Sequence, residues 1–191
     1  MLSSCLVTAS PDFGSPERTP PFLVPDSADP DPRRVLVVTS DTTRVDFSAV
    51  VRSEDDGDTV EARLYIDYGF VNGAGQPFRT SVTDNATTLP PSTFDDDTRR
   101  AQVQWYPDSV PTSPGCHRFT LIVSHGFDSR SGCPLELADS SQITWTVLYC
   151  APGAECPPPI VDPRTDCPPI EARCPELVDQ ATSAAGAGGA P

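Results

Sequence analysis

The stretch Val60-Glu61-Ala62-Arg63-Leu64-Tyr65-Ile66-Asp67-Tyr68 alternates an apolar side chain with a mostly polar one from end to end. A period of two is that of a β-strand, in which successive side chains point to opposite faces of the sheet. The apolar set that begins at Val60 would therefore face a hydrophobic core, and the other set would face solvent. The stretch predicts a half-buried strand.

The same period recurs on both sides of this stretch. Further alternating runs lie at Val45–Arg52, Ala101–Tyr106, Arg118–Ser124 and Ile143–Tyr149, and weaker strands are expected at Val35–Val38 and Phe78–Val82. Turn-forming residues, rich in Gly, Asp and Asn, separate the runs, and no stretch with helical periodicity competes with them. About seven short strands in a domain of this size predict an all-β fold, an immunoglobulin-like antiparallel β-sandwich.

Proline marks the boundaries of this domain. Residues 1–32 hold seven prolines and residues 151–191 hold nine, whereas the 118 residues between them hold only seven. Because proline lacks the N–H that a sheet ladder needs, the sandwich is expected at 33–150. Residues 6–32 would form a Pro/Asp-rich tether, residues 151–180 a mostly irregular Cys/Pro-rich tail, and residues 181–191 a disordered Ala/Gly end.

Charge excludes one class of partner. The chain has 27 acidic and 13 basic residues, so its net charge is −14 at pH 7. Nucleic acid is therefore not expected as a partner. All the basic residues are arginine, which we attribute to high-GC codon bias rather than to selection for anion binding. No apolar run approaches the roughly 20 residues that a membrane-spanning helix needs.

The segment Leu2-Ser3-Ser4-Cys5 matches a bacterial lipobox, in which a branched apolar residue stands three places before a cysteine that becomes acylated. Only Met1 precedes it, without the basic and apolar regions of a signal peptide, so we expect the sequence to be truncated at its start. A chance match in a serine-rich terminus is the alternative. Lipid at Cys5 would anchor the chain to a membrane, most simply the outer membrane of a bacterial envelope.

Cysteine arithmetic agrees with acylation of Cys5. The chain has seven cysteines, and setting Cys5 aside leaves an even number that can form three disulfides. The candidates are Cys116, Cys133, Cys150, Cys156, Cys167 and Cys174. Zinc binding by the tail cysteines is disfavoured, because they lack the short paired spacing of zinc ribbons and fingers.

Two pairings of these cysteines follow from different loop geometries. If the last two strands form a simple hairpin, Cys116 lies opposite Cys150 within the reach of a disulfide. Alternatively, the loop at 126–140 folds back so that Cys133 meets Cys116, and the remaining four cysteines pair within a self-contained tail. We favour the second pairing, since it closes each module by itself.

The segment Gly115-Cys116-His117-Arg118-Phe119-Thr120-Leu121-Ile122-Val123-Ser124-His125, followed by Cys133-Pro134 and Ile143-Thr144-Trp145, resembles surface lipoproteins of high-GC Gram-negative bacteria. Those proteins have a lipobox, a Pro-rich leader and one small β-sandwich, and most have no assigned activity. The resemblance covers the lipobox and about 35 residues near the end of the domain. It implies an envelope location and brings no catalytic residues with it.

Two acidic loops are the candidate metal site. Asp55, Asp56 and Asp58 follow one predicted strand, and a second run is formed by Asp95, Asp96 and Asp97. Calcium takes 6 to 8 oxygen ligands, often from clustered carboxylates. Neither run has the EF-hand spacing, and ordinary solvated loops are the simpler interpretation. Calcium is therefore the one cofactor that the sequence raises.

The two histidines do not predict an enzyme. His117 and His125 belong to the same inward-facing row, at opposite ends of one strand, and would be roughly 27 Å apart. That distance is too great for a shared metal or proton relay. Ser124 and His125 are sequence neighbours that point to opposite faces, so they form no catalytic dyad.

We therefore expect a non-catalytic, monomeric lipoprotein of the cell envelope that acts as a structural or protein-interaction module, with an envelope protein as its partner. The loop at 126–140, which holds Phe127 and Arg130, is the longest candidate surface. The alternatives are a calcium-dependent binding module that uses the acidic loops, and an enzyme whose site is not recognised.

Overall fold

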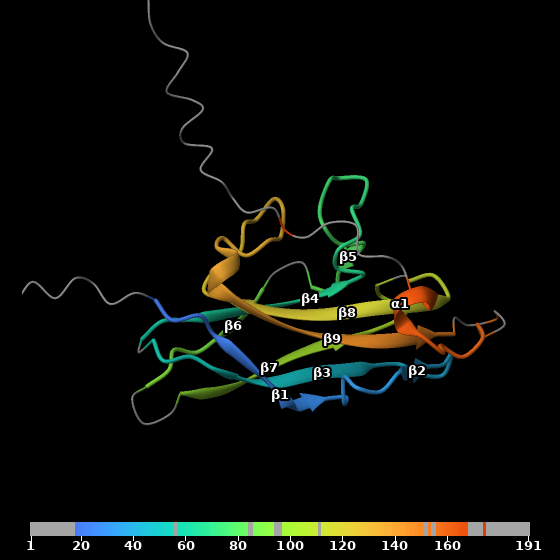
Figure 1. Ribbon diagram of the computed structural model, residues 1–191, viewed down its shortest axis with the longest axis horizontal. Helices are drawn as coiled ribbons and strands as arrows, with labels where there is room; N and C mark the ends of the chain where they lie inside the picture. Colours follow the sequence, from blue (N-terminus) through green and yellow to red (C-terminus); the bar gives the residue numbers. More distant parts are fainter. Residues whose placement is uncertain are drawn as a thin grey trace, which may run out of the picture.

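The computed structural model describes residues 18–55, 57–83, 86–93, 97–110, 112–150, 153, 156–167 and 174. Two layers of β-sheet make up most of this part of the chain (Figure 1). The strands are β1 (Phe22–Asp29), β2 (Leu36–Val38), β3 (Val45–Arg52), β4 (Val60–Ile66), β5 (Thr80–Ser81), β6 (Thr87–Leu89), β7 (Thr98–Trp105), β8 (Gly115–Ser124) and β9 (Ser140–Tyr149). A 3-10 turn spans Leu137–Asp139, and one short helix, α1, spans Pro163–Asp166.

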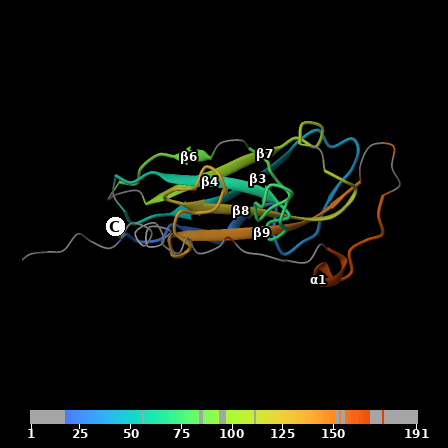
Figure 2. The ribbon, with the colours of Figure 1, turned by 90° about the horizontal axis from the view of Figure 1, so that it is seen from above.

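The strand order is that of an immunoglobulin-like sandwich. One sheet has the order β1-β3-β7, and the other has the order β2-β9-β8-β4-β5, with β6 also paired to β4. The pairs are antiparallel except for β2, which runs parallel to β9. Figure 2 shows β4, β8 and β9 side by side in one layer. The predicted fold class is confirmed, including the mostly irregular segment that follows β9.

The core between the sheets is built by the alternating residues that the sequence predicts to face inward. Phe47 of β3 stacks on Phe119 of β8 with ring centroids 5.0 Å apart, and the edge of Trp145 approaches Phe47 at 5.1 Å. The ring centroid of Trp105 of β7 lies 4.6 Å from that of Phe119. All four side chains are fully buried. Because burying one such side chain stabilises a fold by roughly 1.5–3 kcal/mol, this cluster joins the two layers firmly.

A second, smaller cluster lies on the outer face of the six-stranded sheet. It contains Tyr65, Phe78 and Ile122, with Phe127 packed against it. The Tyr65 hydroxyl donates a hydrogen bond to the carbonyl of Gly132, and burial of the ring raises the pKa of Tyr65 to about 12. The loop at 126–140 is thereby held against the sheet.

Gly132 is the position where this loop requires glycine. Its φ is +71°, which side chains rarely adopt, and an added Cβ would lie 2.8 Å from the ring of Phe78. A larger residue would therefore have to push the loop away from the sheet.

The start of the sandwich differs from the sequence prediction. Residues 22–29, assigned to the tether, form β1, in which Leu23 pairs with Val51 and is 1 % exposed. Pro25 is tolerated because β1 is an edge strand and its register shifts between Val24 and Asp29. The expected boundary at residue 33 is therefore wrong. The short strand β6 was not predicted, whereas strands occur in all seven regions where they were expected.

The disulfides correct both predicted pairings of Cys116. The structure joins Cys116 to Cys167, Cys133 to Cys174 and Cys150 to Cys156. The β8–β9 register places Cys116 opposite Leu148, two residues from the partner that a simple hairpin would give it. Cys167 and Cys174, which follow β9 in the sequence, are bonded to β8 and to the loop at 126–140, so two bridges tie this segment to the sandwich and it is not a self-contained module. All six candidate cysteines are paired, and Cys5 lies outside the described residues.

In the described part of the chain, no helix has the length and apolar character that crossing a membrane requires.

Candidate functional site

Strand β8 carries a buried histidine at each end. His117 lies near its start and His125 directly follows its last residue, Ser124. Their side chains are only 3 % and 2 % exposed. The sequence predicts that both histidines belong to the inward-facing side chains of this strand. Both imidazoles are indeed buried, at opposite ends of the sandwich.

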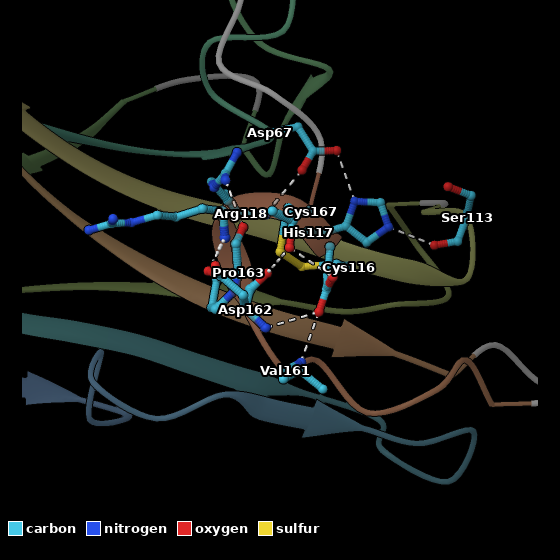
Figure 3. The surroundings of a disulfide bond; sticks show 12 residues. Asp67, Ser113, Cys116, His117, Arg118, Val161, Asp162, Pro163 and Cys167 are labelled. Atoms are coloured by element: carbon cyan, nitrogen blue, oxygen red, sulfur yellow. Dashed lines mark hydrogen bonds and ion pairs between the residues drawn. A yellow bond between two sulfur atoms is a disulfide. The ribbon is translucent and has the colours of Figure 1, made fainter.

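His117 has a hydrogen-bond partner on each ring nitrogen (Figure 3). Nδ1 lies 2.8 Å from Oδ2 of Asp67, and Nε2 lies 2.7 Å from the carbonyl oxygen of Ser113. A carboxylate and a carbonyl oxygen both accept, so each of these ring nitrogens can be a hydrogen-bond donor to its partner. This ring is therefore fully satisfied by the protein.

The carboxylate of Asp67 accepts hydrogen bonds from several donors at this end of the sandwich. Arg79 Nε donates to its Oδ2 at 2.7 Å, and the backbone N–H of Arg118 donates to Oδ1 at 3.0 Å. Burial of Asp67, which by itself would raise its pKa, is outweighed by the hydrogen bond and the charge of His117 together with these donors. The pKa of the Asp67 carboxyl is therefore held below its usual value.

The Cys116–Cys167 disulfide lies beside this network. Arg118 Nη2 donates to the carbonyl of Pro163 at 2.9 Å, and Asp162 caps the first turn of α1 by accepting from the backbone N–H of Arg164. The network and the disulfide together fix the chain that returns from β9. This end of the sandwich has the character of a structural anchor.

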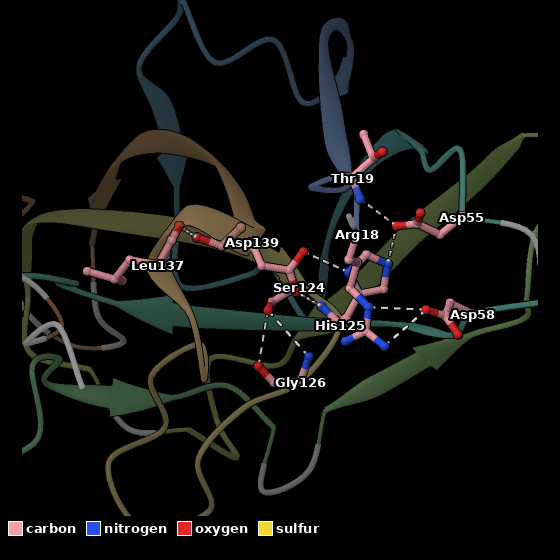
Figure 4. Close-up of polar contacts among 10 residues, drawn as sticks. Arg18, Thr19, Asp55, Asp58, Ser124, His125, Gly126, Leu137 and Asp139 are labelled. Atoms are coloured by element: carbon pink, nitrogen blue, oxygen red, sulfur yellow. Dashed lines mark hydrogen bonds and ion pairs between the residues drawn. The ribbon is translucent and has the colours of Figure 1, made fainter. Parts of the chain in front are cut away.

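His125 is only half satisfied (Figure 4). Its Nδ1 lies 2.7 Å from Oδ1 of Asp139, which ends the 3-10 turn. On the other side of the ring, Nε2 faces Oδ2 of Asp55 at 3.6 Å and has no hydrogen-bond partner among the described residues.

Two carboxylates of the first acidic loop surround this nitrogen. One ligand atom from each of Asp55, Asp58 and His125 lies within 4.8 Å of the other two. Oδ2 of Asp58 is paired with Arg18, whose Nη2 lies 3.0 Å away, and the backbone N–H of Thr19 donates to Oδ2 of Asp55 at 2.9 Å. Asp55 and Asp58 are 21 % and 44 % exposed, so the cluster is open on one side.

The predicted acidic site is thus partly assembled. Asp55 and Asp58 converge, whereas Asp56, Asp95 and Asp96 lie outside the described residues. Asp97 lies at the same end of the sandwich, since its carbonyl accepts a hydrogen bond from the backbone N–H of Ser53. Among the described residues, however, Asp97 is not part of the group with metal-ligating geometry.

Sequence reasoning missed the imidazole at the centre of this cluster. The parity of β8 indicates that His125 is buried, but it does not indicate what surrounds the ring. Its neighbours Asp139 and Arg18 come from segments 14 and 107 residues away. No local pattern could have assigned them.

A groove lies on the outer face of the six-stranded sheet, beside the loop at 126–140. It encloses about 300 Å³. Its walls are formed by Tyr68, Arg118, Thr120, Ile122, Pro134, Leu137, Ser140, Gln142 and Thr144. Next to the groove, Leu135 is 52 % exposed. Phe127 instead packs against the sheet, and Cζ of Arg63 lies 4.9 Å from the centroid of the Phe127 ring. The exposed apolar residue of this loop is therefore Leu135 rather than Phe127.

No family model and no curated protein matches the chain. Among solved structures, the CARDB domain of a Pyrococcus furiosus protein in complex with di-metal ions is 13 % identical over 69 % of this chain and 92 % of that chain, with a TM-score of 0.36. AggA, the major subunit of aggregative adherence fimbriae type I of Escherichia coli, is 20 % identical over 61 % and 88 %, with a TM-score of 0.32. The apo-form Calx CBD1 domain is 14 % identical over 69 % and 98 %, with a TM-score of 0.31. Likenesses of this strength identify neither a family nor a function, and the fold assignment rests on the strand order and registers above.

Proposed function

We propose that the chain is a non-catalytic module of the bacterial cell envelope, anchored by lipid at Cys5, that binds an envelope protein. The observation that carries this proposal is the disulfide pattern. Three bridges use six of the seven cysteines, and Cys5 remains for acylation. Bridges of this kind persist in oxidising compartments such as the periplasm or the cell surface.

The proposed contact surface is the outer groove together with the adjoining Leu135. Small sandwiches commonly bind through an exposed sheet face or the loops that border it. The groove of about 300 Å³ combines apolar walls with hydroxyl and amide groups, a composition suited to protein side chains. The exposed Leu135 adds an apolar contact at its border.

The intact mass of the protein from native membranes tests the anchor. We expect a mass excess of acyl chains, six thiols released by reduction, and no free thiol before reduction. The matched variant Cys5→Ser should leave the membrane fraction without losing its disulfides. An unmodified N-terminus with a free seventh thiol would contradict lipid anchoring.

Photo-crosslinking in the native envelope tests the contact surface. A photoreactive residue at position 135 should capture one stoichiometric neighbour, whereas the same residue at Val161, which is 92 % exposed on the C-terminal segment, should not. Equal capture from both positions, or capture from neither, would contradict the assignment of this surface.

The convergence of Asp55 and Asp58 favours a second candidate function, cation-dependent binding at the acidic end of the sandwich. Calcium, which the acidic loops suggest, should then raise the melting temperature at millimolar concentration. An unchanged melting temperature would remove calcium from consideration.

A further inference from the structure

The tautomer of the neutral His125 ring follows from the group that its Nδ1 contacts. The Asp139 carboxylate, 2.7 Å away, also lies 3.4 Å from the backbone N–H of His125 and can only accept. Nδ1 therefore carries the proton in the neutral ring, and the lone pair is on Nε2. That nitrogen is buried, points into the acidic cluster and has no hydrogen-bond partner in the part of the chain that the structure describes.

The group that faces this lone pair is also an electron-pair donor. Oδ2 of Asp55 lies 3.6 Å from Nε2, and one oxygen of Asp58 lies within 4.8 Å of a ligand atom of each of Asp55 and His125. Donor atoms bound 2.0–2.2 Å from a tetrahedral zinc ion are roughly 3.3–3.6 Å from one another. The distance between His125 Nε2 and Asp55 Oδ2 is already in this range. The Asp58 oxygen would have to move closer to these two residues.

We propose that Asp55, Asp58 and His125 form a binding site for one divalent transition-metal ion, with Zn²⁺ as the probe. The proposal is independent of the lipid anchor. It rests on the cation-dependent alternative, which it narrows from calcium to a metal that accepts an imidazole ligand.

The donor set decides the class of metal. Imidazole nitrogen suits zinc, copper, iron and nickel, whereas calcium takes 6 to 8 oxygen ligands. Three protein ligands leave a fourth position for water or for a group from a partner, as in open zinc sites. The two carboxylates neutralise the charge of the ion.

Asp139 acts as a positioning residue. Metal-bound histidines almost always donate their other ring N–H to a carboxylate or carbonyl, which fixes the tautomer and the orientation of the ring. The hydrogen bond from His125 Nδ1 to Asp139 supplies this support before any metal binds.

Arg18 is the internal competitor of the metal. Its guanidinium is paired with Asp58 at 3.0 Å, and its side chain is 56 % exposed, so it can move into solvent. Binding therefore exchanges one cation for another at Asp58. Removing Arg18 should strengthen metal binding, an effect that loss of structure would not produce.

Calorimetric titration of Zn²⁺ into the disulfide-bonded full chain, without a polyhistidine tag, tests the proposal. The substitution Cys5→Ser is included in every variant, since Cys5 is the one cysteine outside the three bridges. We expect one ion per chain, with affinity reduced more than about 100-fold by His125→Gln and about 10- to 100-fold by Asp139→Asn. Asp58→Asn should also weaken binding, and Arg18→Gln should tighten it.

The matched control is the exposed ion pair of Arg44 and Asp46, 3.0 Å apart at the start of β3, the end remote from the acidic loop. Arg44→Gln and Asp46→Asn should leave zinc affinity unchanged. Cobalt should give visible bands of a site with nitrogen and oxygen ligands, and His125→Gln should abolish them. Circular dichroism and a thiol count confirm that each variant is folded and oxidised.

Three results would overturn the proposal: no saturable zinc binding, zinc binding that survives His125→Gln, or zinc affinity that Arg18→Gln leaves unchanged. Calcium binding without zinc binding would reject the transition metal and retain the cation-dependent alternative. Binding of neither ion would reject both, whatever the result for the lipid anchor.

Discussion

The two ends of β8 carry equally buried histidines with unequal surroundings. His117 is 3 % exposed and has a hydrogen-bond partner on each ring nitrogen, Asp67 and the carbonyl of Ser113. His125 is 2 % exposed and donates to Asp139 from Nδ1, whereas its Nε2 has no partner within the described ranges. Burial therefore does not distinguish a structural histidine from a candidate ligand. The unsatisfied atom distinguishes them.

The difference has a structural origin. At the His117 end, Asp67 follows β4 in a left-handed conformation with φ of 52°, which turns its carboxylate toward the start of β8. At the His125 end, the polar groups come from loops and from the segment before β1. The His117 end is therefore fixed by sheet geometry and a disulfide. At the His125 end, the exposed Arg18 that pairs with Asp58 can be replaced by another cation.

The largest expected effect concerns the disulfide beside His117. Cys116 and Cys167 are 51 residues apart, and in the chain-entropy model closing such a loop stabilises by about 4 kcal/mol. The double variant Cys116→Ser/Cys167→Ser should lower the free energy of unfolding in urea by this amount, in a single transition. The control Cys150→Ser/Cys156→Ser opens a loop of 6 residues and should cost about 2 kcal/mol. Release of the tail with an unchanged midpoint for the sandwich would show that the anchor is not coupled to the fold.

Removing the charge of Asp67 is the next test. Asp67→Asn keeps the shape and tolerates the left-handed backbone, but it removes the buried carboxylate charge that His117 Nδ1 and Arg79 Nε contact. We expect a loss of about 3 kcal/mol in urea unfolding. The exposed ion pair of Asp26 with Arg33 provides the control, since Asp26→Asn should cost about 0–1 kcal/mol. Similar losses in both variants would contradict the anchoring role of Asp67.

The pH dependence of stability sharpens the same point. The pKa of Asp67 is lower in the folded chain than its usual 3.8, so the unfolded state binds more protons as the pH falls through this range. The stabilisation is therefore complete above the usual value and is lost as the pH drops toward the folded pKa. Asp41, Asp128 and Asp166 also have lowered pKa values. Subtracting the Asp67→Asn urea midpoints from those of the unmodified chain isolates Asp67, and identical pH profiles would refute its contribution.

The smallest expected effect on stability is at the His125 end of β8. In the absence of metal, His125→Gln should change the free energy of unfolding by no more than about 1 kcal/mol, because it removes one hydrogen bond and one unpaired buried nitrogen together. The corresponding change His117→Gln breaks a fully paired ring and should cost about 3 kcal/mol. Equal losses in urea unfolding would remove the contrast between the two histidines.

The sequence predicts the strands well because their alternation is a local property. It fails for β1, where only Leu23 is deeply buried and proline and aspartate dominate the composition. It fails for the disulfides because two of them join cysteines that are 41 and 51 residues apart, and no local pattern predicts such contacts.

The candidate site divides in the same way. Asp55 and Asp58 are visible in the sequence because they cluster in one loop. The role of His125 is not visible, because an unsatisfied ring nitrogen depends on where Asp139 and Arg18 lie in space.

Nitrogen-15 NMR of the two imidazole rings, recorded before and after addition of zinc, tests the central claim most directly, since the chain contains only two histidines. The account predicts that one ring, assigned to His117 by substitution, has two protonated nitrogens and does not respond to zinc. The other ring should have an unprotonated Nε2 whose resonance shifts when zinc binds. Identical spectra for the two rings, or a His125 ring that zinc leaves unchanged, would contradict the distinction between a structural end and a metal-binding end.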